Sequence, residues 1–185
     1  MGVTIAPPRV RLGKELTGMT LQSVETARSR QNPIDILEEI VSSNEWLHDR
    51  ASEEELACEV EGRWCDYRMF FVWREETGAL HFSCCFDARV PDAKRHDIHD
   101  LLAMINEKLW LGHFEVSSED SVPMFRHTTL LRGAPGASVE QLEDLVDIAL
   151  TECERFFPAF QFVIWGGKSA SEAIGAAMFE TVGEA

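Results

Sequence analysis

The sequence predicts an α+β fold: an antiparallel sheet of about five strands with helices packed on one side. Three observations support this prediction. Short runs of alternating apolar and polar residues indicate strands, and longer runs with apolar residues at helical spacing indicate helices. Gly, Pro, Asn and Asp separate the runs, as turn residues do. The expected order is α-β-β-β-α-β-β-α plus a C-terminal helix.

The first helix and three strands occupy the first half of the predicted domain. Asn32 and Pro33 are a good N-cap and first helical residue, and an apolar stripe follows to about Trp46. The first strand centres on residues 56–60. The second, residues 65–73, is rich in aromatic and β-branched residues and apolar on both faces at its end, which is typical of a central strand. The third strand, residues 80–87, alternates strictly.

A second helix, two further strands and a third helix complete the pattern. The second helix has an apolar face that runs as far as Leu109, and Gly112 ends it. Strands are expected over residues 113–118 and 123–131. Ser138 begins the third helix with a capping box, and its apolar stripe keeps helical period through Pro158. The sequence therefore predicts one helix kinked at this proline.

Charge divides the 185-residue chain into two parts. Residues 1–31 hold five basic and two acidic side chains, a net charge of +3, and are interrupted by Pro and Gly. We expect a flexible basic N-terminal tail there and a single domain over residues 32–185. That domain holds 12 basic and 30 acidic side chains, a net charge of −18. Such a surface repels nucleic acid and anionic membranes and suits a basic partner segment. The alternative, which the sequence favours, is that the charge only keeps the protein soluble.

The composition predicts a cytoplasmic protein. The longest apolar run, residues 156–165, is shorter than the roughly 20 residues of a membrane-spanning helix. No signal-peptide pattern begins the chain. The five cysteines are odd in number and lack C-x-x-C spacing, so we expect reduced, buried thiols rather than disulfides or a metal site.

The element order, the aromatic second strand and the C-terminal run RFFPAFQFVIWGGKSASEAIGAAMFETVGEA together resemble the YbjN domain, a bacterial family described as sensory-transduction regulators. The resemblance covers residues 32–185. It implies a fold similar to that of class I type III secretion chaperones, which are small acidic dimers that bind extended segments of partner proteins. It implies no enzymatic activity and supplies no catalytic residue.

Two groups of residues are candidates for binding roles. On the second helix, His99, Ala103, Asn106 and Trp110 would form a stripe beside the buried face, which we interpret as a homodimer contact. On the third strand, His81, Ser83, Cys85 and Asp87 would line the polar, exposed side of the sheet. We expect this side to accept a segment of a partner protein. A purely structural polar face is the competing interpretation.

Two motifs suggest other chemistry, and neither is complete. His96 and His99 lie one helical turn apart, but no third metal ligand follows at a known spacing. The alternative function, a nucleotide-binding enzyme or switch, would use Gly167-Lys168-Ser169. A phosphate loop requires another Gly at position 162, which is Phe here. We therefore expect Gly166 or Gly167 to end one helix and Ser169 to cap the next. The sequence predicts a non-enzymatic, dimeric protein-binding regulator or chaperone-like adaptor without catalytic residues, metal or cofactor.

Overall fold

The computed structural model of the chain describes residues 32–182. Its elements in chain order are α1 (Pro33–Ser43), β1 (Leu47–Arg50), β2 (Glu55–Glu61), β3 (Asp66–Arg74), β4 (Ala79–Cys85), the short 3-10 helix η1 (Asp92–Lys94), α2 (Arg95–Asn106), β5 (His113–Val116), β6 (Pro123–Leu130), α3 (Val139–Ile164) and α4 (Ala170–Val182). The predicted α+β class is confirmed. The predicted N-terminal tail lies outside the described residues.

The strands form one six-stranded antiparallel sheet in the order β1-β2-β3-β4-β6-β5. The aromatic strand β3 lies inside the sheet, as its pattern predicts. Strand β1 was not among the five strands predicted from the sequence. After α1, Glu45 adopts a φ of 60° and the Trp46 N–H donates to the Val41 carbonyl at 3.1 Å, which turns the chain back along β2. Strand β1 has only four residues, and Leu47 is the only apolar one, so no alternation marks it.

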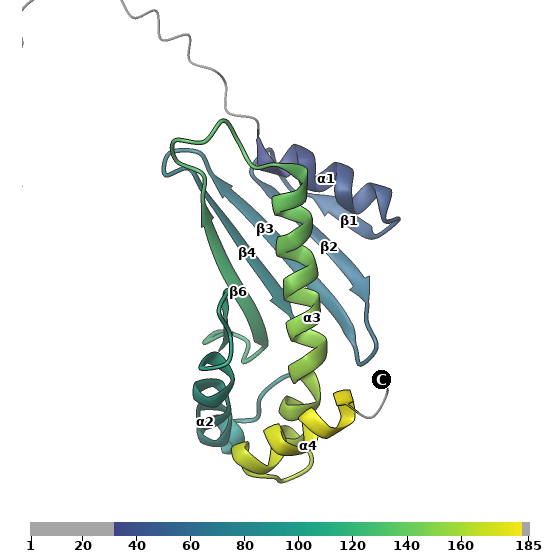
Figure 1. Cartoon of the computed structure of the whole chain (residues 1–185), viewed down its shortest axis with the longest axis vertical. Helices are drawn as coiled ribbons and strands as arrows, with labels where there is room; N and C mark the ends of the chain where they lie inside the picture. Colours follow the sequence, from purple (N-terminus) through teal and green to yellow (C-terminus); the bar gives the residue numbers. More distant parts are fainter. Residues whose placement is uncertain (1–31, 183–185) are drawn as a thin grey trace, which may run out of the picture.

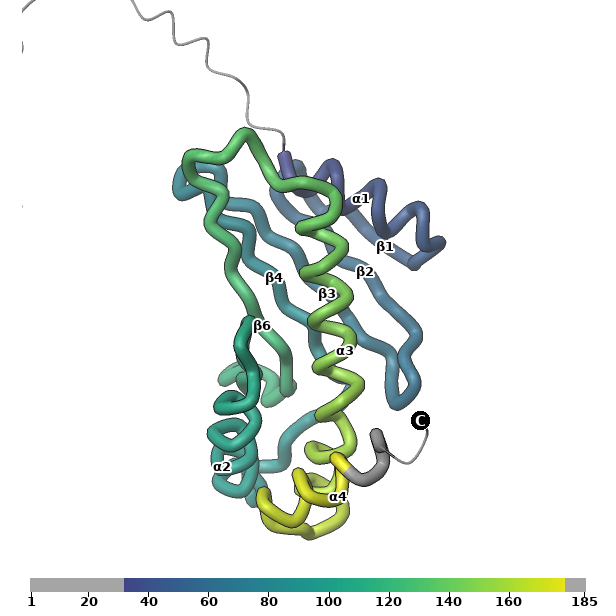
Figure 2. The backbone as a smooth tube through the Cα atoms, in the orientation of Figure 1, coloured from purple at the N-terminus to yellow at the C-terminus, as the bar shows by residue number. Residues whose placement is uncertain are grey.

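Helices α1 and α3 cover one face of the sheet, and α2 and α4 lie together at one end of the molecule (Figure 1). The tube in Figure 2 follows α3 obliquely across β3 and β4. Between helix and sheet lies a core rich in aromatic rings. The ring of Phe86 is 5.1 Å from that of Phe160 and 5.2 Å from that of Phe157, both on α3. Burial of these rings joins α3 to the end of β4.

Local capping follows the sequence closely. The Asn32 side chain accepts from the Ile34 N–H at 3.0 Å, and Ser138 with Gln141 forms the predicted capping box at the start of α3. Helix α3 continues through Pro158, as expected from the unbroken apolar stripe. Within residues 32–182, no helix combines the length and the apolar character needed to cross a membrane.

Helix α2 ends earlier than predicted. Its last residue is Asn106, whereas the apolar pattern suggested continuation to Leu109. The Asn106 side chain donates to the Phe114 carbonyl at 3.0 Å and accepts from the Phe114 N–H at 2.8 Å. This pair of hydrogen bonds ties the end of the helix to the start of β5, so the chain between them must turn back rather than extend the helix. The predicted stripe through Trp110 is therefore not a helical surface.

Candidate binding face of the sheet

One face of the sheet is not covered by the helices in the described part of the chain, and we call it the open face. Strand register assigns its side chains. They are Leu47 and Asp49 in β1, Glu55, Ala57, Glu59 and Glu61 in β2, Asp66, Arg68, Phe70, Val72 and Arg74 in β3, Ala79, His81, Ser83 and Cys85 in β4, Met124, Arg126, Thr128 and Leu130 in β6, and His113 and Glu115 in β5.

Three of the four residues predicted to line this face do so. His81 and Ser83 are half-buried in the middle of the open face, and His81 Nδ1 lies 2.9 Å from Thr128 Oγ1. Cys85 shares the face but is buried, with 8% of its surface exposed. Burial raises the pKa of its thiol to about 11, so it stays protonated at neutral pH. Asp87 is exposed but lies beyond the last residue of β4. The predicted row therefore ends at Cys85.

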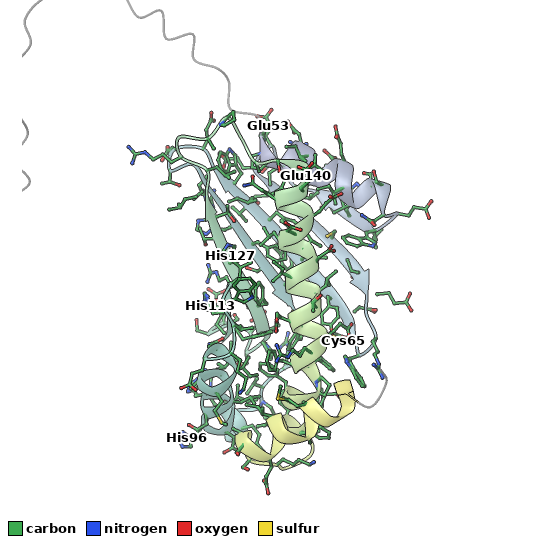
Figure 3. All side chains as sticks on the ribbon, in the orientation of Figure 1. Glu53, Cys65, His96, His113, His127 and Glu140 are labelled. Carbon is green, nitrogen blue, oxygen red and sulfur yellow. The ribbon has the colours of Figure 1, made fainter. Side chains whose placement is uncertain are left out.

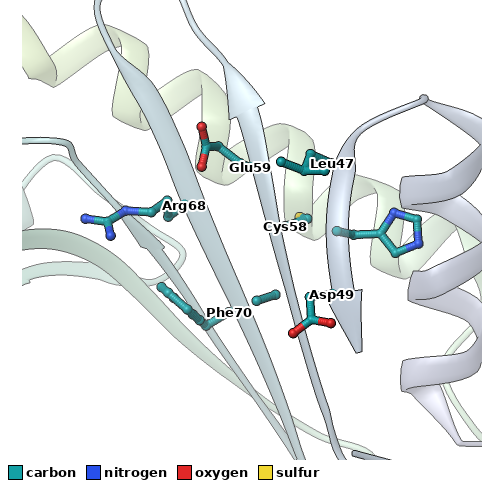
Figure 4. Close-up of a pocket in the computed structure, with 8 residues that line it drawn as sticks. Leu47, Asp49, Cys58, Glu59, Arg68 and Phe70 are labelled. Atoms are coloured by element: carbon teal, nitrogen blue, oxygen red, sulfur yellow. The ribbon is translucent and has the colours of Figure 1, made fainter. Parts of the chain in front are cut away.

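An open hollow of about 320 Å³ lies at the β1 side of the open face. It is lined by Leu47, His48, Asp49, Ala57, Cys58, Glu59, Arg68 and Phe70. In Figure 4, Leu47 and Asp49 project from β1, while Arg68 and Phe70 project from β3 on the other side of β2. Leu47 is 77% exposed and Phe70 is 42% exposed. Exposed apolar side chains that cluster in a hollow are a common mark of a binding surface.

The hollow was not predicted from the sequence. The wall formed by β3 could have been predicted, because the run from Met69 to Trp73 is apolar at every position. Alternate positions of that run must face away from the core. Phe70 and Val72 are those positions. The other wall depends on Leu47 in β1, which has no sequence signal of its own.

The carboxylates of β1 and β2 give this side of the open face a negative charge. Asp49, Glu55 and Glu59 lie on it together with Glu61, and none of the four has an ion pair with another described residue. Arg68 also lines the hollow, opposite Glu59, and the other basic side chains of the open face lie farther from β1. Arg126, for example, is already paired with Glu115 at 2.7 Å. The β1 side of the face therefore offers apolar contact beside carboxylates that have no ion pair within the described part of the chain.

Of the remaining cysteines, Cys58, Cys84 and Cys153 are buried and Cys65 is partly buried. All five are free, and Cys58 and Cys84 lie within the core. Burial raises the pKa of Cys58 to about 12 and that of Cys65 to about 11, and it also raises the pKa of Cys153. A thiol with a raised pKa is a weak nucleophile because little of it is present as thiolate.

The four residues of the predicted dimer contact do not form one surface. His99 and Ala103 are exposed on α2. Asn106 is held by its two hydrogen bonds to Phe114. Trp110 lies after the helix and is 94% exposed. Asn106 is therefore half-buried and engaged within the fold, whereas Trp110 projects into solvent.

The histidines of α2 are not gathered with other ligands. His96 and His99 are both exposed, and Figure 3 shows His96 well away from His113 and His127. No group of three or more His, Cys, Asp or Glu side chains within residues 32–182 has the geometry to hold a metal ion.

Gly167-Lys168-Ser169 joins two helices. Gly167 has a φ of +67°, and the Lys168 N–H donates to the Phe162 carbonyl at 3.1 Å, which closes the end of α3. Ser169 Oγ accepts from the Glu172 N–H at 3.4 Å, and Glu172 Oε2 accepts from the Ser169 N–H at 3.0 Å. The Lys168 ammonium lies 4.3 Å from the centre of the Phe162 ring. The predicted cap-to-cap junction is confirmed, and the segment before it is helical rather than the strand that a phosphate loop requires.

Comparisons with known proteins gave one family model and a similar solved structure. The model of the YbjN family, described as "putative bacterial sensory transduction regulator", matches residues 33–162. Among solved structures, a crystal structure of YbjN from E. coli, described as a putative transcription regulator, matches with a TM-score of 0.48 and 10% sequence identity. The match covers 80% of this chain and 93% of that chain. No curated protein matches the chain.

Proposed function

The chain belongs to the YbjN family, and on this premise we propose that it is a non-enzymatic, chaperone-like regulator that binds segments of partner proteins on its open face. The observation that carries the proposal is the hollow beside Phe70. It combines apolar side chains exposed to solvent with neighbouring carboxylates that form no ion pair within residues 32–182. A surface of this kind fits an extended peptide that carries both apolar and basic side chains.

The exposed edge of strand β1 is a second reason to propose a peptide as the ligand. Strand β1 pairs with β2 on one side only, and the other side is a sheet edge within the described residues. An edge strand presents backbone N–H and C=O groups that an incoming extended segment can pair with. The hollow beside it would then provide side-chain selectivity. Backbone pairing gives affinity for any extended segment, whereas the apolar and acidic lining selects the sequence.

The proposal that the protein is not an enzyme is supported by the protonation of its cysteine thiols. The thiols of Cys58, Cys65 and Cys85 have raised pKa values because they are buried, which keeps them protonated. Cys58 is the one of these three that lines the hollow, and we propose that the lining acts by shape, apolar contact and charge. We also propose that the working form is a homodimer, with the exposed Trp110 in its contact.

The test is capture followed by a binding measurement. A photo-cross-linking residue in place of Ser83, in the middle of the open face, traps bound segments in cells, and mass spectrometry maps them. A synthetic peptide of a trapped segment is then titrated against the wild type and Phe70→Asp. We expect Phe70→Asp to weaken binding by about tenfold or more, a loss of about 1.4 kcal/mol. Trp165→Ser, which removes an exposed tryptophan elsewhere, is the control and should bind as the wild type does. Equal affinity of all three proteins would refute the open face as the binding surface.

A further inference from the structure

The hollow on the open face leaves apolar surface exposed within the described part of the chain. Leu47 and Phe70 lie diagonally across β2 from each other: Leu47 is opposite Glu59, and Phe70 is opposite Ala57. Covering such a surface releases water and is favourable by about 25 cal/mol for each Å² of apolar area. A segment tethered close to the hollow would therefore gain from lying in it.

The charge at the hollow favours a basic occupant. Asp49 and Glu59 line it directly, and Glu55 and Glu61 lie on the same face of β2. Arg68 is the only Lys or Arg in its lining, and it stands opposite Glu59 in the strand register. An occupant with arginine or lysine beside apolar residues would contact both the apolar side chains and the carboxylates.

The chain contains a segment of this composition in its first 31 residues. That part carries a net charge of +3, against −18 for the remainder. Arg9-Val10-Arg11-Leu12 alternates basic and apolar residues, and Lys14 follows. In an extended conformation, such alternation places Val10 and Leu12 on one side and the arginines on the other. Val10 and Leu12 can then face the apolar side chains of the hollow, and the long arginine side chains can reach round the segment to the carboxylates.

The point of attachment is close to the hollow. The Asn32 side chain donates to the Glu53 carbonyl at 2.7 Å, and Glu53 lies in the turn between β1 and β2. The segment joins the domain beside that turn. Strand β1 is about 13 Å long at roughly 3.3 Å per residue. The linker from Leu12 to Asn32 spans up to about 65 Å when extended. A tether of this length gives an effective concentration in the millimolar range, so a weak contact is sufficient.

We propose that residues 9–14 of the chain dock in the hollow between Leu47 and Phe70. The apolar residues of the segment contact Leu47, Ala57 and Phe70, and its basic residues lie beside Asp49 and Glu59. This docking does not rest on the proposed function, and it can be tested without a partner.

The experiment is limited digestion of the full chain with trypsin, which cuts after Arg9, Arg11 and Lys14. Cleavage rates at these sites are compared with those in a synthetic peptide of residues 1–31. Docking should slow cleavage in the wild type by about tenfold at low salt, equivalent to a docking equilibrium of about 1.4 kcal/mol. The protection should disappear in Leu47→Asp/Phe70→Asp. It should also weaken at about 1 M salt, where the Debye length falls to roughly 3 Å.

Three controls make the result decisive. Trp110→Asp places the same charge on an exposed tryptophan away from the hollow and should keep the protection. Arg9→Glu/Arg11→Glu changes only the segment and leaves Lys14 as its cleavage site. Cleavage after Lys14 should lose its protection in this variant. Circular dichroism should show that the fold is unchanged. Protection should not depend on protein concentration, since the contact is within one chain. Equal cleavage in wild type and hollow variants, or protection that rises with concentration and so indicates a second copy, would overturn the proposal. Either outcome leaves peptide capture on Ser83 as a separate test of the proposed function.

Discussion

Gly62 lies in the hairpin between β2 and β3, where that hairpin contacts helix α3. A Cβ at this position would lie 2.6 Å from Glu154 Oε1 and 2.7 Å from the Cys65 carbonyl oxygen, and it would also collide with the buried ring of Tyr67. The Glu154 carboxylate accepts from the Arg63 N–H at 2.8 Å, and its backbone carbonyl accepts from the Trp64 indole at 3.1 Å. Absence of a side chain at Gly62 is therefore what allows the hairpin to approach the helix.

We expect Gly62→Ala to destabilise the fold by about 1–3 kcal/mol, because overpacking must shift a buried ring or backbone. The measurement is the free energy of unfolding in urea. Gly175→Ala is the matched control, since a Cβ there meets nothing within 4 Å and the residue lies in α4. This variant should gain about 0.5–1 kcal/mol from better helix propensity. A neutral Gly62→Ala would contradict the close contact between hairpin and helix.

We expect the titration of His127 to contribute to the loss of stability at acid pH. It lies half-buried on β6 opposite Phe82, on the helix-covered side of the sheet. Desolvation, with a smaller contribution from the nearby His113, lowers its pKa below 6.5 in the folded state. The unfolded chain then binds the proton first as the pH falls below about 6.5. Stability contributed by the neutral imidazole is therefore present above this pH and is lost as the pH falls through the window between the unfolded and the folded pKa.

His127→Gln should flatten this loss, because glutamine does not titrate there. The difference between the free energies of unfolding at pH 7.5 and pH 5.5 is the quantity to compare with the wild type. His96→Gln, which replaces an exposed histidine on α2, is the control and should keep the wild-type dependence. An unchanged dependence in His127→Gln would show that His127 does not titrate differently in the two states.

At the scale of the element, one arginine links strand β1 to helix α1. The Arg50 guanidinium contacts Asp35 at 2.7 Å and Glu38 at 2.6 Å, both on α1, and Arg50 Nε donates to the Ser52 carbonyl at 3.1 Å. These hydrogen bonds to carboxylates raise the pKa of Arg50 further above its usual range. The arginine therefore joins the edge strand to the first helix and to the turn that follows the strand.

Arg50→Ala should lower the melting temperature by about 2–4 °C, because the fork-like contact with two carboxylates is lost while solvent screens part of its energy. Arg74→Ala is the matched variant, since its single contact with Glu54 is longer, at 3.4 Å, and more exposed. It should change the melting temperature by less than Arg50→Ala does. The effect of Arg50→Ala should also shrink at high salt. Equal shifts in the two variants would contradict a special role for Arg50.

The same two elements show what sequence patterns could and could not predict. Alternation located β2, β3 and β4, and capping residues located the starts of α1 and α3, because these features depend on local chemistry. Strand β1 was missed because pairing with β2 and contacts with α1, not its own four residues, make it a strand. The end of α2 was misplaced because Asn106 binds Phe114, a contact that only the folded chain creates. The hollow could not be predicted for the first of these reasons, since one of its walls is β1.

At the scale of the whole molecule, surface charge and exposed aromatic area act against each other. The chain carries a net charge of −15, which makes copies repel at low salt. Trp110 is 94% exposed, and tryptophan is a frequent anchor of protein interfaces. The proposed homodimer therefore requires the apolar contact at Trp110 to exceed the repulsion. Its strength should rise with ionic strength, which is the opposite of what an interface of ion pairs would show.

Light scattering on a gel-filtered sample measures this directly. We expect a mass of twice the chain's 20.9 kDa at tens of micromolar protein, with a dimer that tightens as salt is added. Trp110→Ser should shift the protein to the monomer, because it removes the central apolar contact. Trp165→Ser removes another exposed tryptophan, at the end of α3, and should remain dimeric. A wild type that stays monomeric at both low and high salt would exclude the homodimer. A dimer that survives Trp110→Ser would place its contact elsewhere, and the exposed His99 and Ala103 on α2 would be the next positions to change.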